Sequence, residues 1–240
     1  MTHCYAISRL SVAMATSAAL LCACSHTDAA HPASQATTEP ASSTPATAPP
    51  AEPIDITQIT EGTSLPAAKY LVPYLHDHGP MRAVVDVPEG YTAGVVIGAP
   101  TGDAAFWGKV TRVATDACLG GSRSVGPSVR ELATALAFQR GMAHSRLVPV
   151  SVGGYRGFYL KSTAPANLHR CRSNRVLLYT AGGGSTWLQD DVPAATFRLW
   201  ILNVRGQRVV AGTRTGPEVT NGDPLVHMIE TAEFTSVDRP

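Results

Sequence analysis

Apolar residues recur with two different spacings along residues 54–240, and each spacing predicts a different kind of element. Short runs rich in Val, Ile, Leu and aromatic residues, bounded by Gly, Pro or Asn, predict β-strands. Arg205 and Gly206 separate two such runs, which is the spacing of a β-hairpin. The predicted strands cover residues 81–87, 93–97, 106–115, 148–152, 157–161, 176–179, 197–204, 207–213 and 234–237.

Two segments carry the signals of α-helices. Ser128 can cap a helix in which Glu131 completes a capping box, and apolar residues then recur at helical spacing until Gly141 marks the end. The second helix is predicted after Asp223 as its cap, with Pro224 at its first position. Because most predicted strands are followed by another strand, we expect an α+β domain in which two helices pack on a mostly antiparallel sheet.

The first 53 residues differ in composition from the rest of the chain. Residues 1–23 contain one charged side chain, Arg9, and then a short apolar run. This pattern predicts an export signal, because a membrane span needs roughly 20 apolar residues. Residues 24–53 consist mainly of Ala, Ser, Thr and Pro and predict an extended tether. Residues 54–240 are then long enough for a single domain with its own core.

The end of the predicted signal, Leu-Cys-Ala-Cys, resembles a bacterial lipobox. The resemblance implies that Cys24 is lipidated and becomes the mature N-terminus. We therefore expect a protein anchored by lipid at the extracytoplasmic face of the cell membrane. A cut a few residues later, which would release a freely secreted domain, is the alternative.

Charge argues against one class of partner. Removal of Arg9 with the signal reduces the 19 basic residues of the chain to 18, which equals its 18 acidic residues. Binding to nucleic acid depends on a marked positive excess, so a formally neutral chain is not expected to bind it. Only a local basic patch could hold a polyanion.

Two cysteines remain outside the signal and the lipobox. In an exported chain, Cys118 and Cys171 are expected to form one disulfide. The alternative is a free reactive thiol beside a base, which would need a reducing compartment.

A short histidine pattern is the clearest candidate for a metal site. His76 and His78 are two residues apart, so on a strand they would lie on one face and could bind zinc together with a third ligand. The alternative is a polar turn, and no second pair of ligands supports the metal, so we predict no metal or cofactor. The candidate third ligands are His144, His169 and His227.

Two loops could bind an anion. The glycines at 182–184 could present backbone amides, but they lack the following helix and the lysine of a phosphate loop, which favours a surface loop. Arg170, Arg172 and Arg175 surround Cys171, and planar guanidinium groups suit phosphate or carboxylate. The alternative for these arginines is a solvated loop over the disulfide. They are the best candidates for a binding site in the sequence.

Three segments resemble segments that recur in actinobacterial envelope lipoproteins of unassigned function: residues 126–136, 149–157 and 199–210. The resemblance covers roughly residues 80–237 and places Cys118 and Cys171 where that group has its cysteines. The layout of lipobox, tether and compact domain is also similar to that of the LpqN-type lipoproteins, which implies a PsbP-like fold. Residues 214–222 depart from the pattern of the group.

These observations predict a lipid-anchored envelope protein that acts as a non-catalytic binding or accessory module. Its partner would be an envelope lipid, a glycan or a protein. The sequence shows no nucleophile elbow and no His-Glu-x-x-His motif, so we do not expect an enzyme. The alternatives are a metal-dependent envelope enzyme that uses His76 and His78, and a purely structural spacer.

Overall fold

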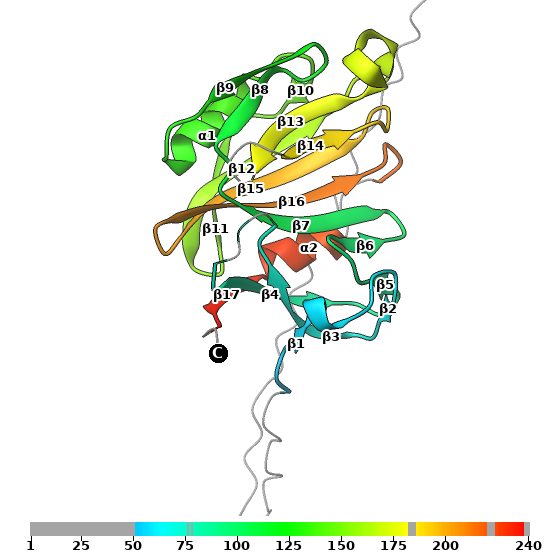
Figure 1. Ribbon diagram of the computed structural model, residues 1–240, viewed down its shortest axis with the longest axis vertical. Coiled ribbons are helices and arrows are strands. Elements are labelled where there is room, and N and C mark those ends of the chain that lie inside the picture. Colours follow the sequence, from blue (N-terminus) through cyan, green and yellow to red (C-terminus); the bar gives the residue numbers. More distant parts are fainter. Residues whose placement is uncertain (1–50, 76, 78, 182–185, 220–223, 238–240) are drawn as a thin grey trace, which may run out of the picture. The chain divides into compact units, whose positions relative to one another are not determined.

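The computed structural model describes residues 51–75, 77, 79–181, 186–219 and 224–237. All of these residues belong to the second of two compact units, which spans Pro49–Pro240. The expected α+β class is confirmed, since the described residues form two α-helices and mostly antiparallel strands (Figure 1). The predicted cap of the second helix, Asp223, and the predicted lipidation site, Cys24, lie outside the described residues.

The largest sheet in the described part of the chain has nine strands and forms the middle of the domain. Its strongest pairing is the predicted hairpin, in which Val204 pairs with Gln207 across Arg205 and Gly206. Both turn residues have positive φ angles, 51° and 83°, which matches the twist of the two strands. In spatial order the strands are β10 (Ala143–His144), β12 (Tyr155–Thr163), β15 (Thr196–Val204), β16 (Gln207–Thr215), β7 (Gly102–Gly108), β6 (Ile97–Ala99), β5 (Tyr91–Thr92) and β2 (Ser64–Leu65), and β11 (Val148–Val152) also pairs with β12.

Two smaller sheets accompany the central one. The first has the order β1 (Ile54–Asp55), β3 (Ala68–Pro73), β4 (Met81–Val87) and β17 (Glu233–Ser236). The second has the order β14 (Thr186–Asp190), β13 (Val176–Ala181), β8 (Arg112–Asp116) and β9 (Gly120–Ser124). Three short 3-10 helices complete the elements: η1 (Ile56–Gln58), η2 (Leu168–Arg170) and η3 (Arg172–Asn174).

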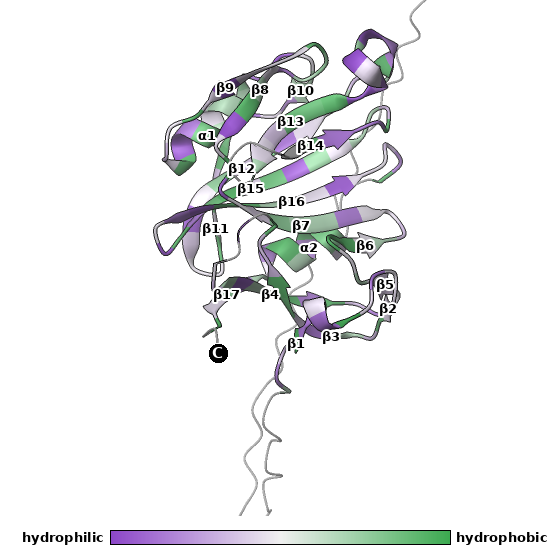
Figure 2. Ribbon diagram, in the orientation of Figure 1, coloured by the Kyte–Doolittle hydropathy of each residue, from purple (hydrophilic) through white to green (hydrophobic). Residues whose placement is uncertain are grey.

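Both faces of the central sheet are buried, and alternate residues of β15 show this. Trp200 and Leu202 belong to one apolar cluster, which includes side chains of β3, β4 and helix α2 (Pro224–Glu230). Leu199 and Ile201 belong to the other cluster, which includes side chains of β8, β13 and helix α1 (Val129–Ala137). Because successive side chains of a strand point to opposite faces, a strand buried on both faces must be apolar almost throughout. This explains the composition of β15 (Figure 2).

Helix α1 begins as predicted and ends earlier than predicted. The Ser128 hydroxyl accepts a hydrogen bond from the Glu131 N–H at 3.1 Å, and the Glu131 carboxylate accepts one from the Ser128 N–H at 3.0 Å. The Ser128 hydroxyl also donates to the Glu131 carboxylate at 2.7 Å, and this hydrogen bond together with the one from the Ser128 N–H lowers the pKa of Glu131. The helix ends at Ala137 rather than near Gly141, because Gln139 turns inward and donates to the buried carbonyl of Ala114 at 3.0 Å.

The predicted strand over residues 106–115 is wrong, because these residues form the end of β7 and most of β8, in two different sheets. The extended conformation is interrupted at Lys109, whose φ is 50°. Its ammonium group lies 3.0 Å from the buried carboxylate of Asp77, which comes from a distant part of the chain. The predicted strand 93–97 is also wrong, because residues 93–96 form the loop between β5 and β6 and only Ile97 belongs to a strand.

Candidate anion-binding surface

The expected disulfide is present and joins two turns. Cys118 follows β8, and Cys171 lies between η2 and η3, 53 residues later. Two backbone hydrogen bonds cross the same junction: the Arg172 N–H donates to the Cys118 carbonyl, and the Leu177 N–H donates to the Ala117 carbonyl, both at 2.8 Å. The turn after β8 and the η2–η3 segment therefore form one cross-linked end of the domain.

Charge is unevenly distributed along the chain. Residues 112–175 contain ten basic and only two acidic side chains, a formal charge of +8, and the rest of residues 24–240 carries the opposite excess. Among the described residues, only Arg140 of these ten has a carboxylate within 4.0 Å, that of Asp116 at 3.7 Å. The net charge of the whole chain does not show this excess, whereas the net charge of successive segments would have shown it. The ten are Arg112, Arg123, Arg130, Arg140, Arg146, Arg156, Lys161, Arg170, Arg172 and Arg175.

Two of the three predicted arginines share a hollow beside the disulfide. Arg172 and Arg175 line one side of this hollow of about 550 Å³, which we call the arginine hollow. Arg170 is exposed but does not line it. The other lining residues are Gly120, Gly121, Ser122, Ser173, Leu177 and Gln189.

Two glycines at the start of β9 also line the arginine hollow. Gly120 and Gly121 have φ angles of 88° and 75°, which residues with a Cβ rarely adopt. The Asp116 carboxylate accepts hydrogen bonds from the N–H groups of Cys118 and Leu119, both at 2.9 Å, and so holds the turn in place. These contacts fix the turn that leads into the hollow.

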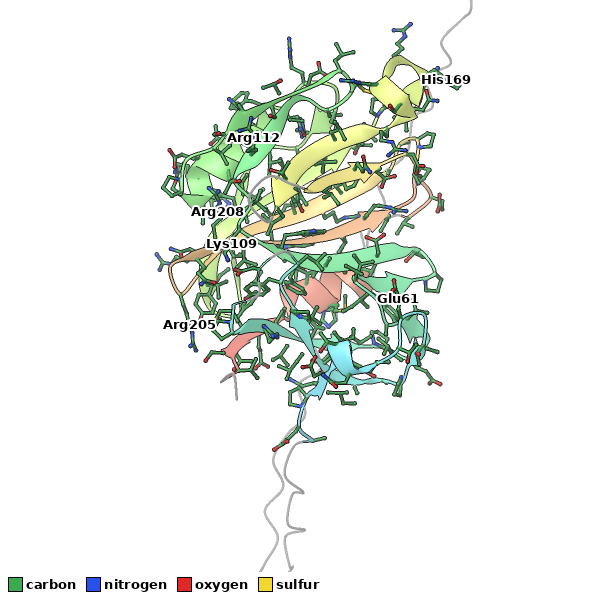
Figure 3. The ribbon with its side chains drawn as sticks, in the orientation of Figure 1. Glu61, Lys109, Arg112, His169, Arg205 and Arg208 are labelled. Atoms are coloured by element: carbon green, nitrogen blue, oxygen red, sulfur yellow. A yellow bond between two sulfur atoms is a disulfide. The ribbon has the colours of Figure 1, made fainter. Side chains whose placement is uncertain are left out.

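One of the lining residues has a hydrogen-bond donor without a partner in the described part of the chain. The Nε of Arg175 is buried and has no hydrogen-bond partner among the residues described. Arg112, which Figure 3 labels, donates from its guanidinium to the hydroxyl of the lining residue Ser122 at 2.7 Å. A buried donor without a partner is costly, and charged donors form the strongest hydrogen bonds to anions. The hollow therefore has the charge and the donors to hold a phosphate or carboxylate.

A second basic hollow, which the sequence reasoning missed, lies between α1 and the β11–β12 hairpin. It has a volume of about 640 Å³ and is lined by Arg130 and Arg156 together with apolar side chains such as Pro149 and Phe158. The guanidinium of Arg130 lies 4.9 Å from the centre of the Phe158 ring, a cation–π contact. The basic surface therefore extends beyond the disulfide end.

The described residues do not form the predicted zinc site. His76 and His78 lie outside the described residues, and Asp77 between them is paired with Lys109. Within the described ranges, no group of three or more His, Cys, Asp or Glu side chains is placed to hold a metal. The glycines at 182–184 also lie outside these ranges.

Among the described residues, His144 makes the one histidine–serine contact, the arrangement in which a histidine can act as a base for a serine nucleophile. Its Nδ1 lies 2.8 Å from the Ser162 hydroxyl and its Nε2 lies 2.8 Å from the Gln139 carbonyl oxygen. Burial lowers the pKa of His144, which favours the neutral ring. Ser162 is only 2% exposed, so the contact joins β10 to β12 and offers no hydroxyl to a substrate.

Comparison of the chain with known families, with curated proteins and with solved structures finds no match. No helix in the described part of the chain is long and apolar enough to span a membrane. The resemblance to envelope lipoproteins and the PsbP-like fold stay predictions.

Proposed function

We propose that this chain is a lipid-anchored cell-envelope protein whose domain is a non-catalytic binding module for an anionic envelope component. The observation that carries the proposal is the basic surface of residues 112–175, where nine of ten cationic side chains have no carboxylate partner among the described residues. The arginine hollow is the part of this surface that is best built to hold an anion.

The arginine hollow is preorganised for binding. The disulfide and the two backbone hydrogen bonds beside it hold Arg172 and Arg175 against the β8–β9 turn. Binding to a rigid site avoids much of the entropy cost of ordering side chains and loops. Guanidinium groups bind phosphate and carboxylate with two parallel hydrogen bonds, so the expected ligand carries one of these groups.

The predicted anchor and the disulfide support the same location. Disulfides persist in oxidising compartments, which suits a chain that is exported and then held by lipid at Cys24. Intact and native mass spectrometry of protein purified from its own membrane tests this part. A mass that begins at an acylated Cys24 supports it, and an unlipidated mass that begins elsewhere contradicts it.

Anion binding can be tested with soluble probes. We expect inorganic phosphate and glycerol phosphate to shift the amide resonances of Gly120 and Gly121 in NMR titrations of the mature chain. Each charged hydrogen bond contributes about 1.5–3 kcal/mol, so Arg172→Gln with Arg175→Gln should weaken binding at least about ten-fold. Arg205→Gln, an exposed arginine in the β15–β16 turn, is the matched control. Equal binding by the double variant and the wild type would refute the assignment to the arginine hollow.

A further inference from the structure

The two most exposed large apolar side chains of the described residues lie at the disulfide end. Phe138 is 76% exposed and Leu119 is 68% exposed. Phe138 follows α1, and Leu119 lies in the turn between β8 and β9. Exposed apolar surface at one end of a domain is a feature of interaction sites when the side chains belong to one patch.

Backbone contacts bring these two segments together. The Ala117 N–H donates to the Arg140 carbonyl at 2.7 Å, and Asp116 and Arg140 form a β-bridge. The segment after α1 therefore lies along the β8–β9 turn, next to Cys118 and the disulfide. We call residues 117–120, 138–141 and 168–174 the disulfide tip.

The same three segments carry exposed cations. Arg140, Arg170 and Arg172 are all exposed in the disulfide tip, and Arg172 is bonded through its N–H to the Cys118 carbonyl. Asp116 is buried and is the single acidic residue between 112 and 130. The tip therefore combines two exposed apolar side chains with three exposed arginines, and Asp191 is an acidic neighbour that lines a hollow with His169 and Asn174.

The opposite end of the domain has the opposite charge. Figure 1 shows β1, where the chain enters the domain, at the lower end, and Figure 3 shows His169 of the disulfide tip at the upper end. Residues 51–111 contain seven acidic and three basic side chains, including the labelled Glu61. An anionic surface would repel this end and attract the disulfide tip, which sets the orientation of the domain.

We propose that the disulfide tip docks on a bilayer that contains anionic phospholipids. Leu119 and Phe138 enter the boundary between headgroups and acyl chains, while Arg170, Arg172 and the arginine hollow bind lipid phosphates. Apolar side chains with neighbouring cations are the combination that binds at this depth of an anionic membrane. The inference rests on the proposed function, since the lipid phosphate is the anion of the arginine hollow. A soluble anionic glycan would leave the two apolar side chains without a role.

Vesicle co-sedimentation tests the proposal. The mature chain with Cys24→Ser carries no acyl group, and it is expected to fold because both apolar clusters lie within residues 56–234. We expect it to bind vesicles of phosphatidylcholine mixed with phosphatidylglycerol and not vesicles of phosphatidylcholine alone. Arg170→Gln and Arg172→Gln should each weaken binding about five-fold, the equivalent of about 1 kcal/mol per arginine at an anionic surface.

The decisive variant is Leu119→Ser with Phe138→Ser, which removes exposed side chains and leaves the arginines in place. It should lower vesicle binding at least about ten-fold, because the variant lacks the two apolar side chains whose burial in the bilayer stabilises binding of the wild type. It should also keep the wild-type response to inorganic phosphate. Val95→Ser, at a side chain that is 65% exposed between β5 and β6, and Arg205→Gln are the matched controls and should bind vesicles as the wild type does.

The outcomes separate the two proposals. If phosphate binds at the arginine hollow but the vesicles do not bind, or the Leu119 and Phe138 variant still binds them fully, membrane docking is overturned and the proposed function stands. If neither phosphate nor vesicles bind, both proposals fail. Loss of vesicle binding in this variant with phosphate binding retained is the result that supports docking.

Discussion

Removal of the Cys118–Cys171 disulfide should lower the free energy of unfolding by about 2–4 kcal/mol. The loop that it closes spans 53 residues, for which the loss of chain entropy in the unfolded state corresponds to about 4 kcal/mol at 25 °C. Measured effects are often smaller than this value. The two backbone hydrogen bonds across the same junction remain in the folded state, so we expect its structure to persist without the disulfide.

The variant should remove the cross-link without burying a new polar group. Cys171 is 5% exposed, so Cys171→Ala is preferred there, whereas Cys118 is half-buried and tolerates Cys118→Ser. Urea denaturation followed by tryptophan fluorescence gives the free energy, because Trp107 and Trp200 are buried and report on the core. The melting temperature should fall by roughly 5–15 °C.

Wild-type protein unfolded in the presence of a reductant is the control for this measurement. It lacks the same cross-link but keeps both cysteine side chains, so its stability should match that of the double variant. A loss below about 0.5 kcal/mol in both samples would refute the loop-closure argument. A loss in the variant alone would show that the substitutions, and not the missing cross-link, are responsible.

Two further predictions concern the central sheet. Gly157→Ala should destabilise the protein by about 1–3 kcal/mol in urea denaturation, because a Cβ there would collide with the Ile201 carbonyl oxygen of the neighbouring strand; an unchanged midpoint would contradict this close approach. Burial lowers the pKa of His144 below its usual value of 6.5, so the unfolded state binds a proton more readily than the folded state does. The free energy of unfolding should therefore be highest above pH 6.5 and should decrease as the pH falls from 6.5 towards the lower folded-state pKa. His144→Gln should flatten this decrease, and equal slopes for the two proteins would show that another group causes it.

Features that depend on residues close in sequence were predictable. The capping box of α1 joins Ser128 to a residue three positions later, and the β15–β16 hairpin depends on Arg205 and Gly206. Local hydrogen bonds and turn conformations follow from such short patterns. The disulfide was also predictable, because only Cys118 and Cys171 lie outside the predicted signal and lipobox.

Features that depend on distant residues were not predictable in this way. Residues 106–115 have the composition of one strand, yet they belong to two strands in different sheets. The strand is interrupted at Lys109, which pairs with the buried Asp77. Strand β9, with the sequence Gly-Gly-Ser-Arg-Ser, has no apolar pattern and is a strand because it pairs with β8. Tertiary pairing overrides local propensity in both places.

The sequence by itself determined the elements with strong local signals, the disulfide and the α+β class, because each depends on nearby residues or on composition. Only the tertiary structure decided which cations share a surface. Arg172 and Arg175 face the β8–β9 turn because the disulfide and the hydrogen bonds beside it join segments more than 50 residues apart. Leu119 and Phe138 lie at the same end for a related reason, since backbone bonds between residues 117 and 140 bring their segments together. Contacts between distant residues form when the whole chain packs, so no local pattern records them.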